Sequence, residues 1–93
     1  MPKNRFEQVD EPQQDAITLS LAGRDGKSYG VITCPVGVSD GRLPEDVTSR
    51  EMGDVEAFRS AIRLANEIKA PIVVLDPEGL WNAEWGDLYR PLD

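Results

Sequence analysis

The clearest pattern of apolar and polar positions lies in residues 54–76, where an amphipathic stretch is followed by a short apolar run. In the amphipathic part, apolar residues recur every three or four positions in two neighbouring rows, which predicts a helix with a broad apolar face. Asp54 suits the N-cap of this helix. Pro71 ends it, because proline lacks an N–H group and disfavours a helical conformation in the residue before it. The first row is Val55, Phe58, Ile62, Ala65 and Ile68 or Lys69, and the second is Ala57, Ala61, Leu64 and Ile68.

A β-hairpin is predicted before the helix. Residues 16–22 alternate between apolar and polar side chains, residues 28–34 form a second strand, and Asp25-Gly26 favours a type I′ turn between them. The turn places Leu19 opposite Ile32, and a shift of one residue would move the apolar side chains to the wrong face of the sheet. In this register one face carries Ile17, Leu19, Leu21, Ile32 and Cys34.

The order of these elements predicts an α+β fold with a small mixed sheet. Residues 72–75 are apolar at every position, which indicates a strand covered on both faces. A helix that connects two strands of one sheet makes them parallel, so we expect this third strand to be parallel to the second hairpin strand. The central helix is expected to cover one face of the sheet. An aromatic C-terminal segment with Trp81 and Trp85 is expected to cover the other face.

The remaining parts of the chain carry weaker patterns. Residues 1–15 are polar and contain two prolines, so we expect a flexible N-terminal tail before a single domain at residues 16–93. In the alternative, Phe6 and Val9 dock on the sheet as an edge segment. Residues 35–53 form a long connection in which Pro44 is a fair start for one or two helical turns. Such a connection is either functional or merely mobile.

Composition narrows the classes of function. The chain has 93 residues, a net charge of −7, no histidine and one cysteine, Cys34. The acidic balance argues against nucleic acid or an anionic membrane as a partner, since both are polyanions. No apolar run is long enough for a membrane span, and we expect a cytoplasmic protein. Cys34 lies on the apolar face of the hairpin, which favours a small buried core residue over a reactive thiol.

Acidic residues provide one candidate for chemistry. Asp76 follows the apolar strand, at the end of a parallel strand where α/β folds place ligand groups. Together with Glu78 and Asp40 it could hold Mg²⁺ or Ca²⁺ through oxygen ligands. The alternative is that Asp76 simply opens the turn Asp-Pro-Glu-Gly. The sequence contains no cofactor motif and no nucleophile–base pattern, so we expect no cofactor and no catalytic residues.

These observations favour a small, acidic, non-catalytic interaction or regulatory domain that binds a protein partner or forms a homodimer. The predicted sheet has open edges, which can add a strand from another chain. The candidate residues for partner binding are Trp81, Trp85 and Tyr89, since Trp and Tyr are enriched in binding hot spots, although core packing is the alternative. The second hypothesis is a divalent-cation-dependent enzyme or small-ligand binder centred on Asp76 and residues 35–53.

Overall fold

The computed structural model describes residues 5–38, 41 and 44–89. Within these residues, seven strands form one mixed sheet with one main helix. The strands are β1 (Arg5–Val9), β2 (Ile17–Arg24), β3 (Lys27–Cys34), β4 (Val47–Thr48), β5 (Met52–Gly53), β6 (Ile72–Leu75) and β7 (Asp87–Tyr89), and the helix is α1 (Asp54–Ile68). Short 3₁₀ turns lie at η1 (Val36–Val38) and η2 (Ala83–Trp85).

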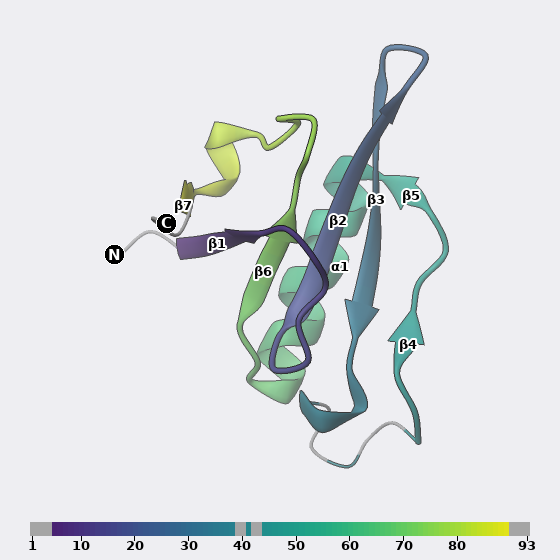
Figure 1. The fold of residues 1–93 in the computed structure, drawn as a ribbon, viewed down its shortest axis with the longest axis vertical. Helices are drawn as coiled ribbons and strands as arrows, with labels where there is room; N and C mark the ends of the chain where they lie inside the picture. Colours follow the sequence, from purple (N-terminus) through teal and green to yellow (C-terminus); the bar gives the residue numbers. More distant parts are fainter. Residues whose placement is uncertain (1–4, 39–40, 42–43, 90–93) are drawn as a thin grey trace.

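The strands follow the order β4-β3-β2-β6-β1-β7, and β5 also pairs with β3. Helix α1 lies behind the sheet in Figure 1, while β1 and its connection to β2 cross in front. The helix therefore covers only one face of the sheet. This arrangement confirms a small α+β fold with a mixed sheet and one main helix.

The hairpin of β2 and β3 is confirmed in its turn and its register. Asp25 and Gly26 have φ values of 53° and 75°, as a type I′ turn requires. Leu19 pairs with Ile32 across the two antiparallel strands. The apolar face that this register creates is buried under α1 and forms most of the core.

The third strand has a different partner from the one expected. Strand β6 lies beside β2 and is parallel to it. Since β2 and β3 are antiparallel, β6 runs opposite to β3, and the expectation that it would be parallel to the second hairpin strand is wrong. The connection after β3 contains β4 and β5, which both run back along β3. The strand that leads into α1 is thus β5, which has the same direction as β6, as a helical crossover requires.

The same connection contains no helix at Pro44 in the part that the structure describes. Residues 44 and 45 form a bend before β4, so the predicted helical turns are wrong there. The connection is held to β3 by Ser49, whose Oγ accepts a hydrogen bond from the Ile32 N–H at 2.9 Å. The Ser49 N–H donates to the Ile32 carbonyl at 2.8 Å. These two bonds extend the pairing of β4 with β3 by one residue and satisfy the backbone N–H and carbonyl of Ile32.

The N-terminal segment is part of the sheet. Strand β1 lies between β6 and β7 and is parallel to both. Phe6 is only 4% exposed and belongs to the core. A flexible tail over residues 1–15 is therefore wrong for β1, because the backbone of this strand is hydrogen-bonded on both sides. The alternative, in which Phe6 docks on the sheet, is closer to the structure, although β1 is not an edge strand.

Helix α1 packs on the sheet through its smallest side chains. Ala57 and Ala61 are wholly buried, whereas Val55 is 43% exposed, so the row that begins at Ala57 faces the sheet. The N-cap residue is Gly53 rather than Asp54. At the other end, Lys69 has left-handed angles (φ 56°, ψ 45°), and the chain then turns into Pro71 and β6.

The aromatic C-terminal segment lies beside α1, on the same side of the sheet. The ring of Trp85 stacks on that of Phe58 from α1, with centroids 4.6 Å apart and an interplanar angle of 6°. Trp81 also contacts Phe58, at 5.8 Å between centroids. The expectation that this segment would cover the opposite face is therefore wrong. Phe58 lies on the flank of α1, where its ring contacts Trp81 and Trp85. The sequence pattern predicts instead that Phe58 contacts the sheet.

Candidate functional site

In the described part of the chain, no helix lies over the face of the sheet opposite α1. Side chains alternate along a strand, so the neighbours of the buried Leu19, Ile32 and Val74 point to this side. Most of them are half-buried. We call this surface the helix-free face, and its residues on the paired strands are Val9, Ser20, Ala22, Tyr29, Val31, Thr33, Val73 and Leu75.

One end of the helix-free face is covered by the connection between β1 and β2. The N–H of Gln13 in this connection donates to Oγ1 of Thr18 on β2 at 3.2 Å. Thr18 is fully buried as a result, and Ala16 is only 2% exposed. The connection is thereby held on the sheet, and farther along the helix-free face Val31, Leu75 and Tyr29 are half-buried.

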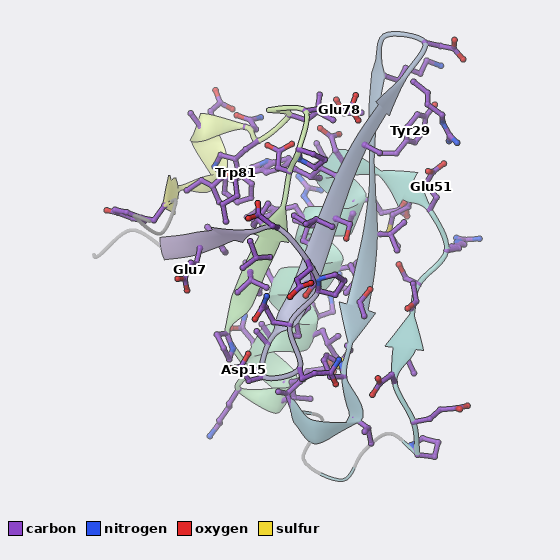
Figure 2. All side chains as sticks on the ribbon, viewed as in Figure 1. Glu7, Asp15, Tyr29, Glu51, Glu78 and Trp81 are labelled. Carbon is purple, nitrogen blue, oxygen red and sulfur yellow. The ribbon has the colours of Figure 1, made fainter. Side chains whose placement is uncertain are left out.

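A groove of about 760 Å³ lies between β1, its connection to β2 and the end of β6. Val9 and Val73 of the helix-free face belong to its lining. Among the residues that the structure describes, the lining contains no lysine or arginine. It contains five carboxylate residues, Glu7, Asp10, Glu11, Asp15 and Asp76. In Figure 2, Glu7 projects from β1 and Asp15 lies near the end of the connection that leads to β2.

Four of these acids are exposed, namely Glu7, Asp10, Glu11 and Asp15. In the described part of the chain, the ion pair joins Arg24 to Glu51, far along the sheet from the groove. The side chain of Arg24 also lies over the ring of Tyr29, with 4.8 Å between its Cζ atom and the ring centroid. The four carboxylates thus form no ion pair with a basic side chain that the structure describes, and the described part of the groove lining is acidic.

Asp76 has a structural role. Its Oδ1 accepts the Leu80 N–H at 2.8 Å, and its Oδ2 accepts the Trp81 N–H at 2.9 Å. The side chain is only 2% exposed. Its backbone carbonyl accepts a bond from Nε2 of Gln8 at 3.0 Å, which ties the end of β6 to β1. Asp76 therefore shapes the turn that directs the aromatic segment back to α1, in agreement with the alternative in which it opens a turn.

The other residues of the predicted cation site are not brought to Asp76 by the described structure. Glu78 is exposed, and its Oε2 accepts the N–H of Gly23 at 3.2 Å. Asp40 lies outside the described residues. Among the residues that are described, no three carboxylate, cysteine or histidine side chains are grouped closely enough to hold a metal ion.

The three aromatic candidates for partner binding lie in two places. Trp81 and Trp85 form a cluster with Phe6 and Phe58, in which the two indole rings are 5.1 Å apart. The indole Nε1 of Trp81 donates to the carbonyl of Gly86 at 3.0 Å. Figure 2 shows Trp81 in this cluster, close to η2. These rings bridge β1, α1 and the C-terminal segment, as core aromatics do.

Tyr89 is separate from that cluster. It pairs with Glu7 across β1 and β7, and it is 42% exposed. Its neighbour Leu88 packs against the core, so the alternation along β7 directs Tyr89 to the side of the helix-free face. Tyr89 thus lies next to an acid of the groove.

Cys34 is a core residue, as the hairpin pattern predicted. It is 2% exposed, and its Sγ lies 3.8 Å from the carbonyl oxygen of Pro35. Burial raises the pKa of the thiol, and the negative charge of Asp46 adds to the rise. The thiolate, which is the reactive form, is therefore disfavoured.

The acidic groove was not anticipated from the sequence. Its four exposed acids lie in the first 15 residues, where the polar composition predicts a flexible tail. The available signal was the apolar pair Phe6 and Val9, which lies within the same acidic stretch. Only the pairing of β1 with β6 turns these acids into one wall of a groove.

Comparison with protein-family models, with curated proteins and with solved structures finds no match to this chain. In the described part of the chain, no helix is both long and apolar enough to span a membrane.

Proposed function

We propose that this chain is a non-catalytic interaction domain that binds a protein partner through the helix-free face of its sheet. The observation that carries the proposal is the one-sided packing of the sheet. Helix α1 and the aromatic cluster bury one face, whereas Val31, Leu75 and Tyr29 on the other remain half-exposed. Apolar and aromatic side chains that are ordered by a sheet but incompletely covered are suited to contact with another protein.

The face is a better binding surface than the edges of the sheet. On one side the hairpin is followed by β4 and β5, which have two residues each, and on the other side β7 has three residues. Short edge strands offer few free backbone groups, which disfavours the addition of a strand from another chain. The helix-free face extends over β1, β6, β2 and β3 and presents a larger continuous surface.

A different protein is a more favourable partner than a second copy. The net charge of the chain is −7, and four exposed acids lie in the groove beside the helix-free face. A symmetric dimer through this face would bring two such grooves together, and like charges placed against one another are unfavourable. Light scattering during size-exclusion chromatography is expected to give the mass of a monomer.

The proposal is tested by blocking the helix-free face without removing any apolar side chain. Ser20→Arg places a long charged side chain in the middle of this face. Asn66→Arg adds the same charge on the exposed side of α1 and serves as the control. Both variants and the parent chain are immobilised and used to capture proteins from a native extract, which are then quantified by mass spectrometry.

The expected result is that the proteins captured by the parent chain are also captured by Asn66→Arg and are lost with Ser20→Arg. Circular dichroism spectra of the three proteins must agree for the comparison to hold. If Ser20→Arg retains the same captured proteins, the helix-free face is not the binding surface and the proposal is wrong.

A further inference from the structure

The charge around the helix-free face narrows the chemistry of its partner. We infer that this face, with the groove at its end, binds a basic extended segment of another protein in which lysine or arginine alternates with apolar residues. The inference rests on the proposed function and adds the class of ligand to it.

The apolar part of the inference comes from the sheet. Val9 and Val73 lie in the lining of the groove, and Leu75 and Val31 continue the same surface across β6 and β3. An extended segment places every second side chain on the same side, at a repeat of about 6.6 Å, which matches the two-residue repeat of the strands below it. Apolar side chains at alternate positions would therefore meet this surface.

The charged part comes from the groove. Glu7, Asp10, Glu11 and Asp15 come from one strand and the connection that follows it, and all four are exposed. None of the basic residues whose side chains the structure describes belongs to the lining of the groove. Arg24 lies over Tyr29 near the hairpin turn, with Lys27 beside it, and Arg50, Arg59, Arg63 and Lys69 are exposed elsewhere. A negative rim beside an apolar surface is complementary to a segment that carries both positive and apolar side chains.

Two other ligands fit less well. A second copy of the chain would place like charges together, as argued above. A divalent cation would need several carboxylates to converge at about 2.0–2.6 Å from one point, and the described residues form no such group. A basic segment has no such requirement, because exposed ion pairs act across several ångströms in water.

The experiment uses a library of random dodecapeptides displayed on phage, selected against the immobilised full chain. We expect the enriched peptides to carry a net positive charge and alternating apolar residues. The enriched peptides are then synthesised with a fluorescent label, and their affinity is measured by fluorescence anisotropy at low and at high ionic strength.

Two variants locate the site. In the groove variant, Glu7→Gln, Asp10→Asn, Glu11→Gln and Asp15→Asn remove four negative charges. In the control variant, Asp25→Asn, Glu45→Gln, Glu56→Gln and Glu67→Gln remove four negative charges from exposed positions outside the groove. Since each exposed charge pair contributes modestly, the groove variant is expected to lose about tenfold in affinity, and the control variant less than about threefold. High salt should reduce binding to the parent chain and have little effect on the groove variant.

The outcomes separate this inference from the proposed function. If the enriched peptides are neutral or acidic, or if the groove and control variants lose equal affinity for them, the partner is not a basic segment. The proposed function would still hold if Ser20→Arg abolishes the capture of proteins from the extract. A selection that enriches no binding peptide also overturns the inference. If Ser20→Arg captures the same proteins as the parent chain, and the basic peptides bind outside the groove, both this inference and the proposed function are wrong. Amide shifts at the four groove acids on titration with CaCl₂ alone would identify a cation as the ligand and replace this inference.

Discussion

Gly30 on β3 lies directly under Ala57 of α1, and its replacement by alanine tests this packing. A Cβ atom added to Gly30 would lie 2.5 Å from the Cβ of Ala57. Carbon atoms in contact are normally about 3.5–4.0 Å apart, so about 1 Å of additional space is needed. Both Cβ atoms are fixed to their backbones, and no rotation of a side chain can relieve the contact. Either α1 or β3 has to move in Gly30→Ala.

The size of the effect follows from the cost of overpacking. One extra carbon in a well-packed core costs about 1–3 kcal/mol. The loss of glycine's freedom in the unfolded chain offsets about 0.4–1 kcal/mol of this cost. Together these ranges allow about 0–2.6 kcal/mol, and because the 2.5 Å approach is a severe overlap we expect Gly30→Ala to lower the free energy of unfolding by about 1–2 kcal/mol. For a domain of this size each kcal/mol changes the melting temperature by roughly 4–8 °C, so the variant should melt roughly 4–16 °C below the parent chain.

Urea denaturation followed by tryptophan fluorescence measures this change. Trp81 and Trp85 contact Phe58 on α1, so their emission reports directly on the packing of the helix. The matched control is Gly23→Ala in the same hairpin. There the added Cβ would meet Cδ1 of Leu80 at 3.5 Å, an ordinary contact. This variant should stay within about 0.5 kcal/mol of the parent chain.

A second substitution identifies the clash as the cause. Ala57→Gly alone is expected to cost about 1 kcal/mol, because glycine is unfavourable inside a helix. When it is combined with Gly30→Ala, however, it also removes the atom that the new Cβ on β3 would meet. The double variant should therefore be more stable than the sum of the two single changes predicts, by about 1 kcal/mol. Strict additivity, or a Gly30→Ala chain as stable as the parent, would refute the close approach of α1 to β3.

Three further predictions concern single residues. Asp76→Asn should lower the free energy of unfolding by about 2 kcal/mol in urea denaturation, because an amide can accept only one of the two N–H bonds that the buried carboxylate receives; Glu78→Gln, at an exposed position, should cost less than about 0.5 kcal/mol. Lys69→Gly should raise the free energy of unfolding by about 1 kcal/mol, and with it the melting temperature, because glycine adopts the left-handed angles without strain. Lys69→Ala should not raise the melting temperature. Since the pKa of Cys34 is raised on folding, the unfolded chain releases the thiol proton first, and stability should fall above about pH 8.5; this part of the pH dependence, measured by urea denaturation, should be absent in Cys34→Ala.

The parts of the fold that follow from local patterns could be predicted. The Asp25-Gly26 turn and the alternation on both sides of it specify the hairpin and its register, since each depends on residues close in the sequence. The helix is similarly encoded by its apolar spacing. Its rotation was less certain, because two apolar rows were available, and the smaller row with Ala57 and Ala61 faces the sheet. The small side chain of Ala57 lies directly over Gly30, where helix and sheet are too close for an added Cβ.

The long-range pairings could not be predicted for a physical reason. Strands β4 and β5 have two residues each, too short for any alternation to be visible. Without β5, the sequence pattern predicts a helical crossover from β3 to β6, which gives β6 the wrong direction. Strand β1 is equally hidden, since Phe6 is its one fully buried apolar side chain and its partners lie more than 60 residues away in the sequence. Such strands are stabilised by their neighbours rather than by their own pattern.

Strand β1 also determines where function should be sought. As long as residues 1–15 are considered a tail, their acids are a solvated charge with no fixed geometry, and attention falls on Asp76 and on the sheet edges. Once β1 is paired with β6, the backbone of Gln8 and Val9 is fixed, and the connection is held by the bond from Gln13 to Thr18. Asp76 then becomes a support for the turn that carries the aromatic segment. The N-terminal acids become the ordered feature beside an uncovered sheet face, so a change that unpairs β1, such as Phe6→Ala, should weaken partner binding and stability together.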